Sequence, residues 1–511
     1  MQESGPNYYK YQPLLLAVCT LIGMYGGYKM RLPVTEVKNN SETQISNSQN
    51  TIQHLKDVFG YLDAHYPDSI LYDETSDYLT YQLCLALDPF AEYIPVSKSK
   101  KWFDELNPSF NTIGLKSVKI DSKLIIHSIL PNSDAAEKGL KAGYEILRIN
   151  GTPVYQSDDI DSIAENTSGG EVKIDFKDFK NDDEKNLTLQ IKSISNPSIS
   201  LDFNENQQYF YIRLEKISQG TYREFMNKLE DYIQNQKIKN MILDLRGNGG
   251  GLLNEAADIL NQLVAVRDAE LFKTVNKNGR DKSYKSTGKP FFRLEKIVIL
   301  IDQQTASSAE VIAGSLQDLK LAVLIGQETK GKATVLEPFK LAGGAQILIP
   351  TARIYLPSGR CFQKPYETFT GQPTEWLSIF SNAHSEKTFD STAILPDIHI
   401  GKQLSLDEFD EYSELNTILE KIILKQLAFI QKEFLHDDQI ISPKLEVFVS
   451  QILEKELAYK YSHLEKSKIQ NIFQSIILEK TIGQSEAIRA SLKTDPVFLK
   501  AVETIKKSFE F

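Results

Sequence analysis

The sequence MILDLRGNGGGLL at residues 241–253 decides the fold class of this chain. An apolar, strand-like run leads directly into a glycine-rich turn, and helically spaced apolar residues follow. Strand and helix patterns alternate in the same way over residues 197–400, where KIVILID (296–302) and LAVLIG (321–326) are the next apolar strands. This alternation predicts an α/β layer with parallel strands.

The segments on either side of this layer have different patterns. Residues 51–87 carry apolar side chains at helical spacing and predict a helical lead-in. Residues 113–194 contain short alternating strands with glycine-rich turns and one helical stretch, 158–166, which predicts a small β-rich domain. After about residue 404 the chain is charged and helical. A multidomain chain is expected, since 511 residues exceed what one core usually holds.

Composition excludes several classes of protein. Hydrophobic residues at 41% and charged residues at 25% are typical of globular domains, which excludes a disordered chain and a polytopic membrane protein. The net charge of −10 disfavours nucleic acid as a partner. The three cysteines are too scattered for a disulfide framework or a metal site.

One segment near the N-terminus departs from this soluble average. Residues 14–28 (LLLAVCTLIGMYGGY) carry no charge, and Lys29 and Arg31 follow them. At about 1.5 Å per residue the segment spans roughly 22 Å, which suits a signal peptide or short signal anchor better than a full membrane span. A buried core helix is the alternative. Since no small-x-small cleavage pattern is present, we expect a retained single-pass anchor in the inner membrane, with the rest of the chain in the periplasm.

Two of the small-residue turns resemble nucleotide-binding loops but lack a residue that the sequence pattern of such loops requires. In RGNGGGLL (246–253), Leu252 stands where a dinucleotide fingerprint needs its third glycine. In GQETKGKAT (326–334), Ala333 stands where a phosphate-binding loop needs a hydroxyl group. No cofactor and no metal is therefore predicted.

The third turn, TASSAEVIAG (305–314), suits nucleophilic catalysis. Ser307 and Ser308 lie at an expected strand-to-helix junction, where unpaired helical N–H groups can stabilise an oxyanion. A plain helix N-cap is the alternative interpretation. The sequence has neither a GxSxG nor an HExxH motif, and its histidines lie far from this turn along the chain. Lys332, between two small residues, is a candidate base if desolvation lowers its pKa.

Taken together, the three turns resemble the C-terminal processing peptidase family, tail-specific serine proteases with a Ser-Lys dyad and a PDZ domain. Further segments resemble the family in the same order from about residue 50 to 400, and the helical tail resembles the extension of Bacteroidetes-type members. These segments are LDPFAEYI (87–94), PNSDAAEKGLKAGYEILRINGTPV (131–154), TARIYLPSGRCFQKPY (351–366) and LPDIHI (395–400).

The resemblance implies a multidomain α/β protein in which a PDZ-like β domain accompanies a crotonase-like α/β catalytic core. A helical lead-in and a helical C-terminal extension complete the expected chain. The expected boundaries are 1–35 for the signal anchor, 36–107 for a polar linker and the helical lead-in, 108–196 for the PDZ-like domain, 197–404 for the serine protease domain and 405–511 for the helical C-terminal domain.

The resemblance also implies site residues and a substrate. Ser307 corresponds to the nucleophile, Lys332 to the general base, and Asp318 to an acidic position that supports the dyad. The PDZ-like domain would bind the C-terminal tails of exported proteins by pairing them as an added strand. The oxyanion hole would use backbone N–H groups of Gly250, Gly251 and Ser308, the PDZ-like site would use those near Ile113, Gly114 and Leu115, and Asp244, Arg246 and Glu310 would be structural supports.

The chain also departs from the family pattern GKGxVQ after the base. Ala333 replaces a glycine, and Leu336 replaces a glutamine that helps to orient the lysine. The alternative function is therefore a catalytically impaired, membrane-tethered PDZ scaffold that binds tails without cleaving them. An acyl-CoA enzyme with a related α/β core is a more distant alternative. Apolar residues of the tail (419–430) suit a homo-oligomer and core packing equally, and an adaptor is left open.

Overall fold

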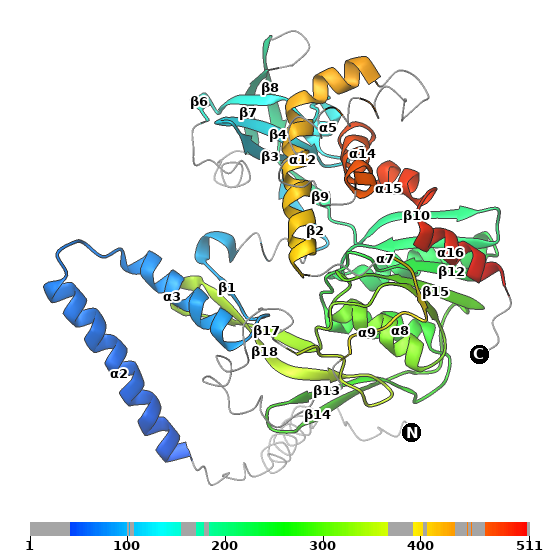
Figure 1. The fold of residues 1–511 in the computed structure, drawn as a ribbon, viewed down its shortest axis with the longest axis horizontal. Helices are drawn as coiled ribbons and strands as arrows, with labels where there is room; N and C mark the ends of the chain where they lie inside the picture. Colours follow the sequence, from blue (N-terminus) through cyan, green and yellow to red (C-terminus); the bar gives the residue numbers. More distant parts are fainter. Residues whose placement is uncertain are drawn as a thin grey trace, which may run out of the picture. The chain divides into compact units, whose positions relative to one another are not determined.

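The chain divides into two compact units, Met1–Ser76 and Asp77–Phe511. Mixed helices and sheets make up the structure, which confirms the α/β class in its general form (Figure 1). The computed structural model describes residues 41–99, 102, 107–154, 170–177, 183–365, 392–401, 406–434, 447, 451 and 466–507.

The predicted single-pass inner-membrane localisation needs correction. Among the described residues, no helix combines the length and the apolar character needed to cross a bilayer. The long helices α2 (Ser41–His65) and α12 (Leu406–Phe434) both carry several charged side chains, which are costly in hydrocarbon. The predicted anchor at 14–28 lies outside the described residues.

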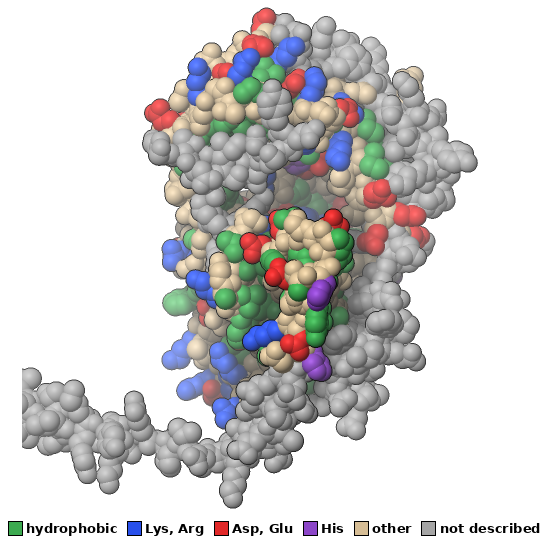
Figure 2. Space-filling view, turned by 90° about the vertical axis from the view of Figure 1, so that its left-hand side faces the viewer, with side chains coloured by type: hydrophobic (Ala, Val, Ile, Leu, Met, Phe, Trp, Pro, Cys, Tyr) green, Lys and Arg blue, Asp and Glu red, His purple; other side chains and the backbone are tan. Residues whose placement is uncertain are grey.

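The first unit contains α2 and the start of α3 (Tyr72–Leu87). The Tyr72 hydroxyl donates to the Asp63 carboxylate at 2.7 Å and its ring lies 6.1 Å from that of Phe59, so the two helices are joined at this end. Apolar side chains of α2 such as Ile52 and Leu55 are more than half exposed. In Figure 2, hydrophobic side chains reach the surface of the face that is shown.

A six-stranded sheet forms the centre of the second unit. The antiparallel strands β10 and β11 begin it, and β12, β15, β16 and β19 continue it in parallel, in the order β10-β11-β12-β15-β16-β19. Because the strands are parallel, their carboxyl ends and the turns that follow them meet at one edge of the sheet. The bounds are Ile199–Glu205, Tyr209–Leu214, Asn240–Asp244, Lys296–Ile301, Val323–Gly326 and Ile398–His399, in that order.

Helices cover both faces of this sheet. Alternate strand residues such as Leu243 and Ile299 pack against α7 (Thr221–Leu229), which η2 (Glu230–Asn235) extends, and against the helices α8 and α9. The opposite set, including Ile242 and Val298, packs against the end of the chain. The remaining helices of these layers are α8 (Leu253–Leu263), α9 (Ser308–Asp318), α15 (Gln484–Leu492) and α16 (Pro496–Lys506).

The chain's C-terminal helix is thus a layer of the α/β core. In Figure 1, α16 lies along β12 and β15, and its side chains Phe498, Ala501 and Ile505 are buried on the sheet. The sequence predicts an accessory helical domain from residue 405 onward, and the structure gives its last two helices a core role.

A second sheet lies beside the carboxyl-end turns. Its order is β1-β18-β13-β14, and β17 pairs with β18. Through β1 this sheet includes the chain just after α3, and through β17 the chain just after Lys332. The strands are β1 (Glu92–Ile94), β13 (Glu270–Asn276), β14 (Asp281–Lys285), β17 (Thr334–Lys340) and β18 (Gln346–Tyr355), with the short helix η3 (Ala342–Gly344) between the last two.

The β-rich domain predicted at 113–194 is a separate sheet with its own core, in which Ile126, Ile174 and Leu189 are fully buried. Its helix expected at 158–166 lies outside the described residues. The sheet order is β3 (Leu115–Ile120), β4 (Lys123–Ile129), β5 (Glu145–Ile149), β7 (Glu171–Lys177) and β8 (Glu184–Gln190). Beside it are α5 (Asp134–Glu137), β6 (Thr152–Pro153), and the pair β2 (Ser109–Thr112) and β9 (Lys192–Ser195).

The helices α12 and α14 (Lys466–Ile482) pack on β3 and β4 through a second apolar cluster that includes Ile120 and Ile125. A polar group borders this contact: the Glu420 carboxylate lies 2.6 Å from His127 Nε2 and 2.6 Å from Lys480 Nζ. Burial alone would raise the pKa of Glu420, but His127 and Lys480 lower it to about 2.

Glu420→Gln should destabilise the protein at neutral pH and should make little difference in acid. With a pKa of about 2 when folded and 4.5 as the ordinary value, the carboxylate stabilises the fold above about pH 4.5 and loses that effect as the pH falls toward 2. Thermal unfolding from about pH 3 to 7 measures it. Glu486→Gln, an exposed position on α15, is the control. A stability difference that is the same at both ends of that range contradicts the prediction.

Candidate active site

The turn between β15 and α9 holds Ser307 in a strained conformation at the helix N-terminus. Its backbone angles are φ 56° and ψ −123°, which a residue with a Cβ rarely adopts and which cost about 1–3 kcal/mol. Neighbouring hydrogen bonds hold the turn: the Thr305 hydroxyl donates to the Leu245 carbonyl at 2.9 Å, and the Ala306 N–H donates to the Asn248 carbonyl at 2.9 Å. Ser307 is half-buried at the start of α9.

The glycine turn after β12 packs directly on Ser307, and this contact requires glycine. A Cβ on Gly250 would lie 2.8 Å from Ser307 Cβ and 3.0 Å from the Ser308 nitrogen. A Cβ on Gly251 would lie 1.9 Å from the Ile217 carbonyl oxygen. Both glycines also have positive φ, 94° and 144°. The backbone of this turn therefore approaches the serine more closely than any other residue would permit.

The three predicted oxyanion donors differ in whether their N–H groups already have a hydrogen-bond acceptor. The Gly250 N–H already donates to the Asn248 side chain at 2.8 Å, so it is engaged within its own loop. Within the described part of the chain, the N–H groups of Gly251 and Ser308 have no hydrogen-bond acceptor. These two remain the candidate donors for a developing negative charge.

Glu310 is the residue that joins the two predicted catalytic positions. Its fully buried carboxylate accepts from the Ser307 N–H at 2.8 Å and from the Lys332 N–H at 2.9 Å. It also accepts from the Gly331 N–H at 2.7 Å and from the Thr329 hydroxyl at 2.5 Å. Burial raises the pKa of Glu310, and these donors oppose that rise. One carboxylate thus fixes the backbone of both segments.

Sequence reasoning treats Glu310 as a structural support and misses this double contact. The available signal is the spacing of Ser307 and Glu310, which fits a capping box at the start of a helix. A capping box explains the bond to Ser307. The bonds to the 329–332 segment depend on tertiary structure, because that segment follows the neighbouring strand β16.

The Lys332 side chain is partly buried. Burial and the nearby Lys330 lower its pKa, while Asp88, Glu310 and Glu92 oppose that shift. Its Nζ lies over the ring of Phe90, 5.1 Å from the ring centroid. A lysine with a lowered pKa is more often neutral near physiological pH, as a general base must be.

Asp318 does not lie at this site. It is the last residue of α9, about 15 Å of helix from its start at 1.5 Å per residue. Its carboxylate accepts from the Ser358 N–H at 3.1 Å and pairs with Arg360 at 3.3 Å. These partners belong to the 358–360 turn, and the expectation that Asp318 supports the dyad stays a prediction.

The segment after Lys332 contains the two positions, 333 and 336, at which the chain departs from GKGxVQ. The Ala333 N–H donates to the fully buried side chain of Gln363 at 2.9 Å, so an amide does lie beside this segment. Leu336 is in β17 opposite Pro350, next to an irregularity in the strand pairing. The Thr334 hydroxyl is buried, with no hydrogen-bond partner among the described residues.

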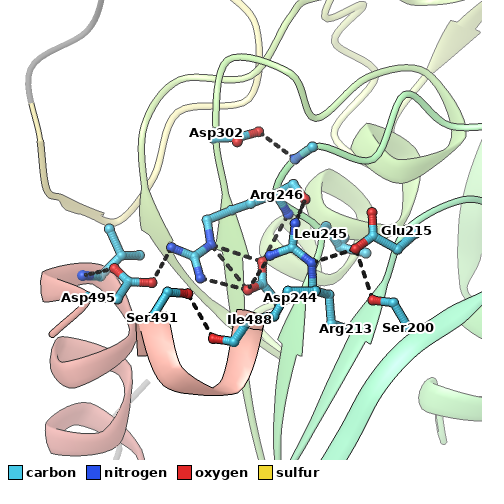
Figure 3. Close-up of polar contacts among 12 residues, drawn as sticks. Ser200, Arg213, Glu215, Asp244, Leu245, Arg246, Asp302, Ile488, Ser491 and Asp495 are labelled. Carbon is cyan, nitrogen blue, oxygen red and sulfur yellow. Dashed lines mark hydrogen bonds and ion pairs between the residues drawn. The ribbon is translucent and has the colours of Figure 1, made fainter. Parts of the chain in front are cut away.

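An ion-pair network fixes the base of the glycine turn (Figure 3). The fully buried Asp244 carboxylate accepts from Arg246 Nη2 at 2.6 Å and from the Tyr211 hydroxyl at 2.6 Å. Burial alone would raise the pKa of Asp244, but Arg246 and Arg213 lower it to about 2. Arg246 Nη1 also donates to Asp495 at 2.5 Å. The turn is therefore tied to the start of α16, a contact that sequence reasoning misses.

The predicted tail-binding loop is tightly closed on its own domain. Gly114 has a φ of 90°, and a Cβ there would lie 1.9 Å from Ser133 Cβ. The Gly114 N–H donates to the Thr112 hydroxyl at 3.0 Å, so it is engaged. Ile113 and Leu115 are buried in the core of the β-rich domain. Within the described ranges, no cluster of acidic, histidine or cysteine residues suits a metal ion.

A protein-family model matches the part of the chain that contains these turns, and known proteins resemble the chain. Residues 208–368 match the family described as Peptidase family S41. The chain is 26% identical over 281 residues to the carboxy-terminal processing protease CtpB of Bacillus subtilis, covering 54% of this chain and 58% of that protein. It is 32% identical over 241 residues to the carboxyl-terminal-processing protease of Synechocystis sp., covering 46% of this chain and 56% of that protein.

The chain thus spans just over half the length of these two relatives. Among solved structures, the photosystem II D1 C-terminal processing protease is 18% identical and has a TM-score of 0.37, with 68% of this chain and 86% of that chain covered.

Glu310→Gln should destabilise the protein and disrupt the site. An amide keeps one acceptor oxygen and turns an NH2 group toward backbone donors, so at least two buried N–H or O–H groups lose their acceptor. We expect the free energy of unfolding to fall by about 2–5 kcal/mol. Denaturant unfolding measures it, with Glu337→Gln, an exposed position on β17, as the control. Equal stability of the two variants contradicts the clamp.

Proposed function

Because the chain carries a peptidase family S41 domain and is related to carboxy-terminal processing proteases, we propose that it is a serine endopeptidase acting on C-terminal tails. Ser307 is its nucleophile and Lys332 its general base. The single observation that carries the proposal is the Glu310 carboxylate, which accepts hydrogen bonds from the backbone of both residues. A shared clamp of this kind keeps two catalytic side chains on a common frame.

In the proposed reaction the neutral Lys332 amine accepts the proton of the Ser307 hydroxyl, whose oxygen attacks the scissile carbonyl carbon. The N–H groups of Gly251 and Ser308 stabilise the resulting oxyanion. The Lys332 ammonium then returns the proton to the leaving amine, and the acyl-enzyme forms on Ser307. Water, deprotonated by the same lysine, releases the acyl group and restores the serine.

Tail recognition is assigned to the β-rich domain, interpreted as PDZ-like. In its described sheet β3 pairs with β4 alone, so the other edge of β3 is available for an added strand. The engaged Gly114 N–H is a poor carboxylate donor, which shifts the expected contact to the neighbouring backbone of Ile113 and Leu115.

A tail-binding scaffold with weak or no cleavage is the second candidate. The observation in its favour is Leu336, an apolar side chain at the position where the family pattern has an amide. Tail binding without turnover by the full chain favours this function over the first.

Ser307→Ala should abolish peptide cleavage, because the reaction loses its nucleophile. We expect the cleavage rate to fall by at least about a thousandfold. The matched control is Ser315→Ala, a buried serine on the same helix whose hydroxyl has no partner among the described residues. An unstructured peptide with an apolar C-terminus serves as substrate, and released product is measured. Cleavage by Ser307→Ala at the parent rate contradicts the assignment.

The rate should rise with pH as Lys332 loses its proton. Its pKa is lowered from 10.5, so kcat/KM is expected to level off below that pH. Lys332→Arg should be as inactive as Lys332→Ala, since a guanidinium stays protonated. A flat pH profile between about pH 6 and 10, or an active arginine variant, would exclude lysine as the base.

A further inference from the structure

The direction of the Lys332 amine needs an explanation, because its backbone clamp does not fix its long side chain. No hydrogen bond joins Nζ to another of the described residues, and Leu336 offers it none. The Lys332 Nζ does lie over the ring of Phe90, with the centroid 5.1 Å away. That distance is within the range at which an aromatic face attracts an ammonium group.

Phe90 is held firmly from both sides. Its N–H donates to Asp88 Oδ1 at 2.8 Å, and the Ala91 N–H donates to the Asp88 carbonyl at 3.1 Å, which closes a turn after α3. Directly afterwards β1 pairs with β18, where Glu92 lies opposite Leu348. The ring therefore belongs to a turn that is fixed by hydrogen bonds. The strand β18 also pairs with β17, which follows Lys332 along the chain.

We propose that Phe90 is a positioning residue for the proposed protease, whose ring face holds the Lys332 amine in its working direction. The inference rests on the Ser307 and Lys332 mechanism above. It gives the turn 88–92, far from both residues in the sequence, a role beside the lysine side chain.

The ring acts most strongly when the lysine is charged. Lys332 becomes an ammonium group as it takes the serine proton, and the negative face of the aromatic ring stabilises that charge. Asp88 and Glu92 on the same turn, together with Glu310, also favour the ammonium form, whereas burial and Lys330 oppose it. Phe90 thus contributes more to the transition state than to substrate binding, so its loss should affect kcat more than KM.

The test compares Phe90→Leu with Phe90→Tyr in the full chain. Leucine keeps an apolar side chain and removes the aromatic face, whereas tyrosine keeps it. We expect Phe90→Leu to lower kcat about tenfold with KM changed less than twofold, and to move the rise of the pH profile to lower pH. Phe90→Tyr should stay within about threefold of the parent. Phe291→Leu, an exposed phenylalanine, is the control.

A direct titration accompanies the kinetics. In the Ser307→Ala background, NMR of the isotopically methylated Lys332 amine measures its pKa with and without Phe90→Leu. The inference predicts a lower pKa in the leucine variant, and this readout needs no turnover. An unchanged pKa of Lys332 overturns the inference, and so does an equal loss of kcat in both Phe90 variants with unchanged pH profiles.

The failure of this inference can be told apart from the failure of the proposed function. If Ser307→Ala cleaves at the parent rate, the proposed function fails. If Ser307→Ala is inactive while Phe90→Leu behaves as the parent, only this inference fails.

Discussion

The Glu310 carboxylate is the interaction on which the site depends. It lies fully buried at the start of α9 and accepts from the backbone of Ser307 on one side and of Lys332 on the other. A buried carboxylate is costly unless donors surround it, and this cost is offset only when both turns are in place. The geometry of the strained serine turn and of the lysine turn is therefore decided together.

The sheet supports this clamp from behind. Asp244 ends β12, and its pairing with Arg246 sets the course of the glycine turn that packs on Ser307. Arg246 reaches Asp495 at the beginning of α16, whose apolar side chains cover the opposite face of the sheet. The last helix of the chain thus helps to position a loop that lies some 250 residues earlier, and it does so through charge and burial together.

The β-rich domain is connected to the C-terminal helices rather than standing alone. Its hairpin of β3 and β4 packs against α12 and α14, with Glu420 between His127 and Lys480 at the edge of the contact. The β-rich domain therefore shares part of its surface with the helices that follow the α/β core. In the described sheet β3 pairs with β4 alone, so its other edge has no partner strand there.

The sequence by itself determined the α/β class, the β-rich insertion and the serine and lysine turns, because these follow from local periodicity, glycine spacing and small residues at strand ends. Tertiary structure decided which side chains serve those turns. Glu310 contacts the backbone of both Ser307 and Lys332, Asp495 pairs with Arg246 of the glycine turn, and the ring of Phe90 lies beside Lys332 Nζ. These pairings join residues tens to hundreds of positions apart, and no periodic pattern encodes them, since they depend on how parallel strands bring separate turns to one edge of a sheet.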